Sequence, residues 1–459
     1  MKVKVKFLGA AKSVTGSKYL VSSDKFNILI DCGQFQGKRE LCKRNWDNLP
    51  INPKDIDAVV LTHAHIDHTG MLPRFHKLGL NCPVYCTPAT LDLVSLLLPD
   101  SGRLQEDEAF YRAKKKKSRH SPPMPLFTEQ DARNVLKLIK PKEFDKTFEI
   151  LENVKITYKR MGHIIGAASL KLEIENKIIN FSGDIGRYSV PILVNPEPVE
   201  FGDLLLIEST YGNREHKDYD IKTKLAEVIN KTYQDNGVLL IPSFAVGRAQ
   251  LLLYYIRELK AENLIPNIPV ILDSPMAADA TQIYKSNPND YDEESNKLFE
   301  SGQSPFNFDK LALIKDSSAS KKLNKIKDPM IIISASGMLY GGRILHHLVQ
   351  RIEDENNAIL FVGYQPPGSK GDKIKRGDEY IKIFQDKFKV NAKIYEISGL
   401  SAHADKNEMT KWIESCKGTP KKVAIVHGEN DVMIGFKKTL EQKYGWNCVI
   451  PDYLEEITV

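Results

Sequence analysis

The sequence predicts an α/β protein that contains two domains. Apolar, strand-like runs alternate with helix-like segments along most of the chain, a pattern typical of sheets flanked by helices. At 459 residues the chain exceeds the usual size of a single domain. Its composition, 42% hydrophobic and 27% charged, is that of an ordinary globular protein, so composition alone identifies no substrate.

The N-terminal region begins this alternation. Residues 1–7 alternate charged and apolar side chains, which predicts a first strand and not a signal peptide. Strand-like runs follow at 56–61 and 83–86, and residues 89–98 are expected to form a helix. No apolar run approaches the length of about 20 residues that crosses a bilayer, and the six cysteines show no paired C-x-x-C spacing. We therefore expect no membrane partner and a cytoplasmic location, in which thiols stay reduced.

A second α/β unit is expected to begin near residue 238. A strand-like run at 238–241 leads through a turn into an amphipathic segment from Gly247 to about Leu259. Later strand-like runs alternate with helix-like segments, which predicts a parallel sheet. These runs lie at residues 270–272, 330–334 and 358–361.

Three histidines and one aspartate fall within six consecutive positions, directly after the strand-like residues 58–61. They are His63, His65, Asp67 and His68. If the chain stays extended through His65, the side chains of His63 and His65 point to the same side, because side-chain direction repeats every second residue. Asp67 and His68 then lie on a turn or helix and face elsewhere.

These four donors predict a metal site. A lone histidine near a strand end is usually a surface or core residue, but a buried cluster of four donors without a cation would leave polar groups unpaired at about 1–3 kcal/mol each. Imidazole nitrogen and carboxylate oxygen together suit zinc. Because one segment presents two ligands in each of two directions, we expect two neighbouring zinc ions.

Two zinc sites need more than four ligands, and the sequence contains further donors where strand-like runs end. They are His163, after residues 154–158, Asp184, after residues 178–181, and His427, after residues 423–426. Because a carboxylate can bridge two cations, Asp184 is the expected shared ligand. His403, within residues 401–405, is the other late candidate.

The middle of the chain is expected to be an insertion. His403 and His427 complete a site that begins at His63, so the chain must return to the first domain after the second unit. We place the first part of that domain at residues 1–208, the inserted domain at 209–395 and the C-terminal part at 396–459. An insertion also creates a cleft between two bodies, in which substrate would lie.

Turns rich in Gly or small residues within the insertion could hold phosphate. They lie at residues 243–248, 334–343 and 363–371. The first precedes a helix whose free N–H groups, with Arg248, could bind an anion, although such turns are also common for packing reasons alone. A formal net charge of +6 is compatible with a polyanionic partner. The basic run at residues 112–120 is expected to be a solvated loop or a patch that attracts a nucleic-acid backbone.

Short motifs are spread almost from one end of the chain to the other. They are Gly9-Ala10-Ala11 with Val14-Thr15-Gly16-Ser17, Ile30-Asp31-Cys32-Gly33, the histidine-rich run at 62–68, Gly162-His163, Ser182-Gly183-Asp184, Glu208-Ser209-Thr210-Tyr211-Gly212, Ser401-Ala402-His403-Ala404-Asp405 and Val426-His427-Gly428. Together they resemble the β-CASP branch of the metallo-β-lactamase superfamily, whose members process nucleic acids. The chain is similar to bacterial and archaeal ribonucleases related to the endonuclease subunit of the cleavage and polyadenylation specificity factor. The resemblance implies an αββα sandwich with an inserted β-CASP α/β domain that contains a parallel sheet.

The resemblance also implies a role for each candidate residue. One zinc ion would be held by His63, His65, His163 and Asp184, and the other by Asp67, His68, Asp184 and His427. Asp31 would orient ligands rather than bind metal. Asp67, Glu208 and His403 would be catalytic, with His403 as the proton donor and Glu208 holding it in place. The RNA-backbone contacts would be Arg248, Ser336 and Arg343.

The implied reaction is hydrolysis of RNA phosphodiester bonds. Two zinc ions generate a hydroxide nucleophile at neutral pH, and in-line attack would expel the 3′-oxygen. The products would carry 5′-phosphate and 3′-hydroxyl ends. Cleavage could be internal, from the 5′ end or both, in RNA processing or decay.

Other functions stay open at this point. A small-molecule hydrolase of the thioesterase or lactonase type could use the same zinc scaffold, although a small ligand needs no second domain with turns suited to phosphate. A non-catalytic RNA-binding subunit would be expected to have lost metal ligands, and none is lost. Single-stranded RNA is the expected partner. DNA stays a possible substrate because only the 2′-hydroxyl distinguishes RNA from DNA locally. A homodimer is compatible with the sequence.

Overall fold

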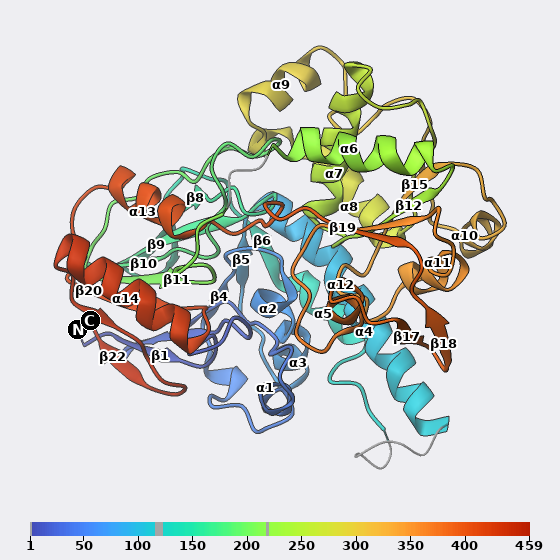
Figure 1. Ribbon diagram of the computed structural model, residues 1–459. Coiled ribbons are helices and arrows are strands. Elements are labelled where there is room, and N and C mark those ends of the chain that lie inside the picture. The colour runs from blue at the N-terminus through green and yellow to red at the C-terminus, as the bar shows by residue number, and fades with distance from the viewer. Residues whose placement is uncertain (1, 115–122, 217–219) are drawn as a thin grey trace. The chain divides into compact units, whose positions relative to one another are not determined.

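The computed structural model describes residues 2–114, 123–216 and 220–459 (Figure 1). The chain forms two compact units. The first comprises the chain up to Ser189 together with residues 194–215 and 403–459, and the second comprises residues 190–193 and 216–402. Apart from residues 190–193, the second unit thus runs from His216 to Ala402, and the sequence predicts the insertion at residues 209–395.

The first unit contains two seven-stranded sheets. One has the order β22-β1-β2-β3-β4-β5-β6 and the other β21-β20-β11-β10-β9-β8-β7. The strands of the first sheet are β1 (Lys4–Phe7), β2 (Tyr19–Ser22), β3 (Asn27–Ile30), β4 (Ala58–Val60), β5 (Val84–Cys86), β6 (Ile139–Pro141) and β22 (Glu456–Thr458). Those of the second are β7 (Phe148–Leu151), β8 (Val154–Arg160), β9 (Ala168–Ile174), β10 (Lys177–Phe181), β11 (Leu204–Glu208), β20 (Lys422–Val426) and β21 (Cys448–Val449). Because β1 pairs with β22, the two ends of the chain lie side by side (Figure 1).

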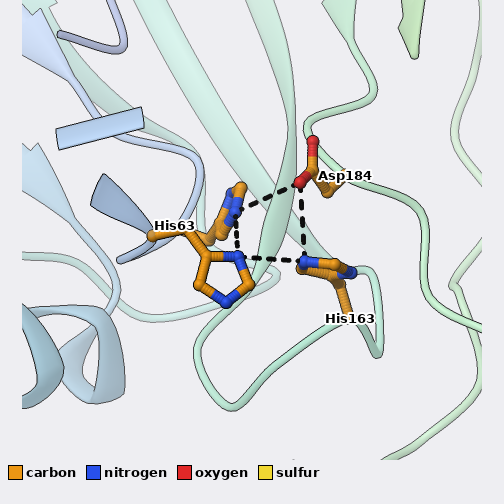
Figure 2. A group of neighbouring side chains, drawn as sticks. His63, His163 and Asp184 are labelled. Atoms are coloured by element: carbon orange, nitrogen blue, oxygen red, sulfur yellow. Dashed lines mark hydrogen bonds and ion pairs between the residues drawn. The ribbon is translucent and has the colours of Figure 1, made fainter. Parts of the chain in front are cut away.

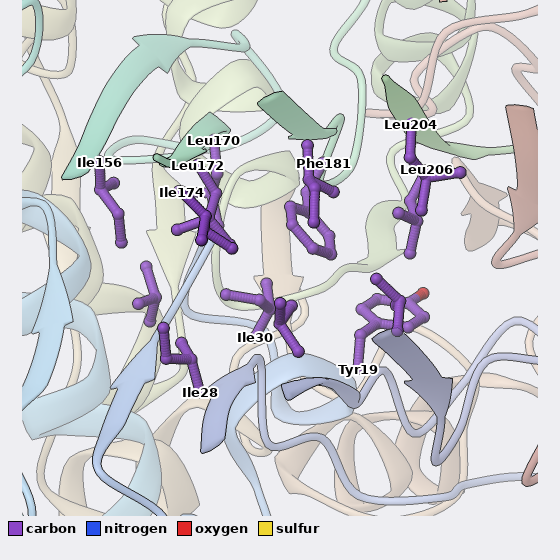
Figure 3. Close-up of a cluster of buried hydrophobic side chains, with 14 of the residues drawn as sticks. Tyr19, Ile28, Ile30, Ile156, Leu170, Leu172, Ile174, Phe181, Leu204 and Leu206 are labelled. Atoms are coloured by element: carbon purple, nitrogen blue, oxygen red, sulfur yellow. The ribbon is translucent and has the colours of Figure 1, made fainter. Parts of the chain in front are cut away.

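The two sheets face one another across the main hydrophobic core of this unit (Figure 3). Strand β11 shows how the sequence builds this layer, since all five of its residues are buried. Leu204 and Leu206 point into the core between the sheets, whereas Leu205 and Ile207 point to the opposite face. Side chains alternate in this way along any strand, so a strand covered on both faces is largely apolar, and in β11 only the last residue, Glu208, is charged.

Helices cover the outer faces of both sheets. Helices α13 (Lys406–Ser415) and α14 (Asn430–Tyr444) pack on the second sheet, where Trp412 and Phe436 join the buried cluster of Leu205. The helices on the side of the first sheet are α1 (Arg39–Arg44), α2 (Ile66–Thr69), α3 (Leu72–Lys77), α4 (Pro88–Lys114) and α5 (Glu129–Val135), with α4 in contact with β6. This arrangement is the expected αββα sandwich.

Helix α4 is longer than the sequence predicts. The expected helix at residues 89–98 continues through Pro99 to Lys114. A proline inside a helix removes one backbone hydrogen bond, but Pro99 is buried and Gly102 lies close against the backbone of Thr128 and Glu129 at the start of α5. Packing against α5 therefore outweighs the local preference. The first part of the basic run, residues 112–114, belongs to the last turn of α4, and residues 115–120 lie outside the described residues.

The second unit is built on a six-stranded parallel sheet with the order β14-β13-β15-β12-β16-β19, as the sequence predicts. Its strands are β12 (Val238–Pro242), β13 (Val270–Leu272), β14 (Leu311–Leu313), β15 (Met330–Ser334), β16 (Ala358–Phe361) and β19 (Lys393–Glu396), and β17 (Tyr380–Ile383) and β18 (Asp386–Lys389) form a separate hairpin. The helices are α6 (Ile221–Gln234), α7 (Arg248–Ala261), α8 (Pro275–Ser286), α9 (Glu293–Glu300), α10 (Ser317–Leu323), α11 (Arg343–Arg351) and α12 (Lys370–Lys375). The described chain also contains the 3-10 turns η1 (Pro53–Asp55), η2 (Leu136–Leu138) and η3 (Pro288–Asp290).

Two further findings concern the described residues. None of their helices combines the length and the apolar character needed to cross a bilayer. All six cysteines are free thiols.

Candidate metal centre

The histidine-rich run changes from strand to helix in its middle. Strand β4 ends at Val60, the backbone is still extended at His65, with φ −57° and ψ 147°, and α2 begins at Ile66. His63 and His65 therefore project from extended backbone, while Asp67 and His68 project from the first turn of a helix. This is the geometry that would let one segment serve two ligand groups.

The first donor group brings together residues from three distant segments. Nδ1 of His65 lies 3.1 Å from Nε2 of His63 and 3.1 Å from Nε2 of His163. Oδ2 of Asp184 lies 3.4 Å from Nε2 of both His63 and His163. Figure 2 shows the side chains of His63, His163 and Asp184 pointing towards one another. One ligand atom from each of the four residues lies within 4.8 Å of every other.

The second donor group lies on the other side of Asp184. Nε2 of His427 is 3.4 Å from Nε2 of His68 and 3.2 Å from Oδ2 of Asp67. Oδ1 of Asp184 is 3.2 Å from Nε2 of His68. The two carboxylate oxygens of Asp184 therefore face different groups, Oδ2 the first and Oδ1 the second.

The chemistry of these groups fits a bound metal ion. Oδ1 of Asp184 is buried and, although Nε2 of His68 lies 3.2 Å away, it accepts no well-aligned hydrogen bond from the described residues. A buried oxygen in this state is costly unless a cation or another group satisfies it. The imidazole nitrogens converge at 3.1–3.4 Å, and ligands at about 2.05 Å from a tetrahedral zinc ion would be about 3.3 Å apart. A metal cofactor is therefore the natural occupant of this cluster.

The protonation state of two histidines in the first group also fits a bound metal ion. Burial, and then the neighbouring imidazole of His63, lowers the pKa of His65 to about 3. Burial and the nearby His403 hold the pKa of His163 well below its ordinary value. Both rings are thus neutral, the form in which histidine binds metal.

Several polar side chains contact the candidate ligands at the ring nitrogen that faces away from the centre. Nδ1 of His68 donates to Oδ2 of Asp31 at 2.7 Å, and Asp31 also accepts from the backbone N–H of Thr62 at 2.8 Å. The Thr62 hydroxyl lies 3.1 Å from Nδ1 of His63. On the other side, the Thr210 hydroxyl lies 3.1 Å from Nδ1 of His427. Each of these contacts fixes the orientation of a ring whose other nitrogen faces the metal centre.

The roles of Thr62 and Thr210 were missed by sequence analysis. Both residues directly flank or follow a predicted site residue, Thr62 before His63 and Thr210 two positions after Glu208. A hydroxyl next to the candidate ligand His63 is a signal that could have found Thr62, whereas nothing in the local sequence marks Thr210.

His403 and Glu208 form a pair beside the same carboxylate. Nδ1 of His403 donates to Oε1 of Glu208 at 3.1 Å, and Nε2 of His403 lies 3.9 Å from Oδ2 of Asp184. Glu208 is buried and also accepts from the backbone N–H of Ile185 at 2.6 Å. Burial opposes protonation of His403, but the charge of Glu208 and its hydrogen bond outweigh burial and raise the pKa of His403 to about 9. An imidazolium at this position can donate a proton at neutral pH.

The three expected RNA contacts lie in the second unit, where each contacts protein groups. Nε of Arg248 donates to the carbonyl of Leu400 at 3.0 Å. The Ser336 hydroxyl donates to the carbonyl of Gly341 at 3.1 Å. Arg343 forms an ion pair of 2.7 Å with the buried Asp273. A contact of these residues with RNA stays a prediction.

Comparison with known families assigns a domain to each region. The model of the metallo-beta-lactamase superfamily matches residues 14–215. The Beta-Casp domain matches residues 249–374. The Zn-dependent metallo-hydrolase RNA specificity domain matches residues 387–451.

Curated proteins match over nearly the whole chain. Ribonuclease TTHA0252 of Thermus thermophilus is 35% identical over 94% of this chain and 94% of its own length. The transcription termination factor FttA of Methanocaldococcus jannaschii is 32% identical over 100% of this chain and 72% of its own length. An RNase J-like protein of the same organism is 30% identical over 95% of each chain.

A solved structure supports the fold alone. A protein of unknown function from Enterococcus faecalis superimposes with a TM-score of 0.54 at 13% identity, and the match covers 100% of both chains. With the family matches and the relative at 35% identity, these findings show that the chain belongs to the β-CASP ribonuclease branch of the metallo-β-lactamase superfamily.

Proposed function

We propose that the chain is a zinc-dependent ribonuclease that hydrolyses RNA phosphodiester bonds and leaves 5′-phosphate and 3′-hydroxyl ends. The observation that carries this proposal is the position of Asp184 between two donor groups, with Oδ2 3.4 Å from His63 and Oδ1 3.2 Å from His68. His403 lies 3.9 Å from the same carboxylate. A paired metal centre with an adjacent proton donor is an arrangement that catalyses phosphodiester hydrolysis. The match to an RNA specificity domain and the likeness to Ribonuclease TTHA0252 support RNA as the substrate.

Each donor group would hold one zinc ion. The first would use His63, His65, His163 and Asp184, and the second Asp67, His68, Asp184 and His427. When bound, two zinc ions supply a hydroxide nucleophile at neutral pH and offset the charge that develops on phosphate. Asp31, Thr62 and Thr210 keep the rings of His68, His63 and His427 turned towards the centre.

His403 is the proposed proton donor to the leaving 3′-oxygen. Its Nδ1 is engaged by Glu208, so Nε2 is the nitrogen that faces the centre. Glu208 favours the protonated ring and fixes its orientation, and it is therefore a positioning residue. General acid catalysis of this kind contributes about 10²–10⁴-fold to a rate.

Arg248, Ser336 and Arg343 are proposed to contact the backbone of single-stranded RNA. The Arg343 guanidinium pairs with Asp273 and donates to the carbonyls of Ile314 and Lys315. Any contact of Arg343 with phosphate would use the donors that these three contacts leave. Replacing a residue that contacts one phosphate should reduce the salt dependence of RNA binding by about one unit of slope.

The cellular setting of the proposed activity is RNA processing or decay, with cytoplasmic location as part of the proposal. The relatives named transcription termination factors add transcription termination as a second setting. The relatives and the RNA specificity match favour RNA over the small esters that a thioesterase or lactonase would use.

The test uses zinc-loaded protein and RNA labelled at either end, with 5′-phosphate and 5′-hydroxyl forms compared. Internal cutting gives fragments of many lengths from both labels, whereas trimming from the 5′ end releases the 5′ label first and prefers one 5′ group. A chelator should abolish cleavage, and zinc should restore it. Retained cleavage by a His403→Ala variant would refute the donor role, and RNA left intact by fully zinc-loaded protein would refute the proposed function.

A further inference from the structure

A cavity of about 460 Å³ opens in the second unit beside the start of helix α11. Its volume lies within the range of about 300–1,000 Å³ that is typical of pockets for small ligands. The cavity is lined mainly by Tyr340, Gly341, Arg343, His346, Lys370 and Phe384. None of these residues belongs to the metal centre.

Two aromatic side chains at this cavity are unusually exposed. Tyr340 keeps 65% of its surface accessible, and Phe384, at the turn of the β17–β18 hairpin, keeps 54%. Phe384 contacts the ring of His346, with the two ring centres 4.9 Å apart. Exposed aromatic rings at the mouth of a cavity are the platforms on which bases of single-stranded nucleic acids stack, whatever the sequence.

The charged lining of the cavity is basic. The ammonium group of Lys370 has three donors, one of which donates to the carbonyl of Leu339 at 3.3 Å. His346 offers an exposed imidazole, and Arg343 is held in place by Asp273. Among the described residues that line the cavity, none carries a carboxylate. Such a lining suits an anion.

We propose that this cavity binds one nucleotide of the RNA substrate, with the base against Tyr340 and Phe384 and the phosphate at Lys370 and His346. The inference rests on the proposed function, because it assigns part of the same substrate to a second place on the chain. An acidic peptide would use the cations but would leave two exposed rings without a flat partner, so a nucleotide fits the lining better.

Photo-crosslinking locates a stacked base directly. An Asp67→Asn chain, in which cleavage is silenced, is mixed with single-stranded oligoribonucleotides that carry 5-iodouridine at one position each. After irradiation, mass spectrometry of the digested protein identifies the modified residue. The expected attachment sites are Tyr340 and Phe384.

Affinity measurements test the same contacts without chemistry. Tyr340→Ala and Phe384→Ala should each weaken binding of the oligoribonucleotide about 5- to 100-fold, the range expected for loss of one stacked base, and Tyr340→Phe should bind as the wild type. Tyr233→Ala removes a ring that is 45% exposed on α6 and serves as the matched control. Gly341→Leu fills the cavity, since a Cβ at Gly341 would meet no heavy atom within 4 Å, and it should weaken binding while both rings remain.

The results separate this inference from the proposed function. RNA bound equally well by the two alanine variants, with no cross-link at either ring, would overturn the nucleotide site while zinc-dependent cleavage by the wild type still upholds the ribonuclease. Cross-links at Tyr340 without any cleavage by zinc-loaded wild type would uphold the site and overturn the ribonuclease. A poly-glutamate peptide whose binding needs both rings, in the absence of RNA cross-links, would overturn the inference in favour of an acidic polypeptide.

Discussion

Nδ1 of His403 lies 3.1 Å from Oε1 of Glu208, although the two residues are 195 positions apart in the chain. Glu208 is the last residue of β11, and His403 is the first residue after the chain returns to the first unit. An isolated β-bridge between Gly186 and His403 brings the returning segment beside the end of the second sheet. The hydrogen bond between His403 and Glu208 therefore forms only because the chain returns to the first unit near the C-terminal end of β11.

The first prediction concerns this pair. Glu208→Gln removes the charge that favours protonated His403, so kcat for RNA cleavage should fall about 10²–10⁴-fold. Because Glu208 is buried behind His403, KM and RNA affinity should stay close to wild type. Single-turnover cleavage measures the rate of the chemical step, and equilibrium binding measures RNA affinity. Glu197→Gln, the same change at a partly exposed position of the first unit, is the control, and a Glu208→Gln variant with the full rate would contradict the pairing.

The second prediction concerns the support of His68. Asp31→Asn weakens the charge-assisted hydrogen bond to Nδ1 of His68, so zinc affinity of the second donor group should fall about 10- to 100-fold. Asparagine tolerates the positive φ of 57° at this position, so the backbone should be preserved. Zinc release in graded chelator measures the effect, with the exposed Asp57→Asn as control. Unchanged release from both groups would mean that Asp31 does not orient the ligand.

The third prediction concerns a close approach at Gly33. A Cβ at this position would lie 1.6 Å from the carbonyl oxygen of Asp67. Gly33→Ala should therefore displace the start of α2, with loss of one zinc ion per chain and a lower melting temperature. Gly341→Ala places the same methyl group in open space and should change neither quantity. A Gly33→Ala protein with two zinc ions and normal activity would show that α2 is not held by this contact.

The fourth prediction concerns a buried acid in the second unit. Asp273 is fully buried and accepts from His347 at 2.6 Å, Ser320 at 2.6 Å and Arg343 at 2.7 Å. Burial alone would raise the pKa of Asp273, but these hydrogen bonds outweigh it and lower the pKa. Asp273→Asn leaves its partners without a counter-charge, so the free energy of unfolding should fall by about 3 kcal/mol near neutral pH.

The pH dependence of that loss follows from the direction of the pKa shift. A carboxyl group with a lowered pKa in the folded state stabilises fully above its ordinary pKa of about 3.9, and this stability is lost as the pH falls through the folded value. The difference between wild type and Asp273→Asn should thus be greatest near neutral pH and shrink below about pH 4. Urea unfolding followed by circular dichroism measures it, with the exposed Asp386→Asn as control. A difference that grows on acidification would rule out this account of Asp273.

The sequence indicated the strands and most of the metal donors because both have local signatures. His63, His65, Asp67 and His68 lie within one run, and Asp184 and His427 each follow an apolar strand, so the pattern alone marks them. The parallel sheet of the second unit was likewise predictable from short apolar runs, three of which match β13, β15 and β16 in both limits.

The parts that could not be predicted depend on contacts between distant segments. The hydroxyl of Thr210 contacts Nδ1 of His427, which is 217 positions away in the chain. Nothing in the local sequence distinguishes Thr210 from other threonines. Helix α4 continues beyond Pro99 because it packs on α5. The local sequence around Pro99 does not predict this contact. The ion pair of Arg343 with Asp273 joins residues 70 positions apart, so the local sequence around the Gly-rich turn does not predict it.

X-ray anomalous diffraction at the zinc edge, on crystals of the active protein, tests the central claim most directly. The account predicts two peaks, one among His63, His65 and His163 and one among Asp67, His68 and His427, with Asp184 between them. A single peak, or peaks away from Asp184 in protein that still cleaves RNA, would contradict the paired zinc centre.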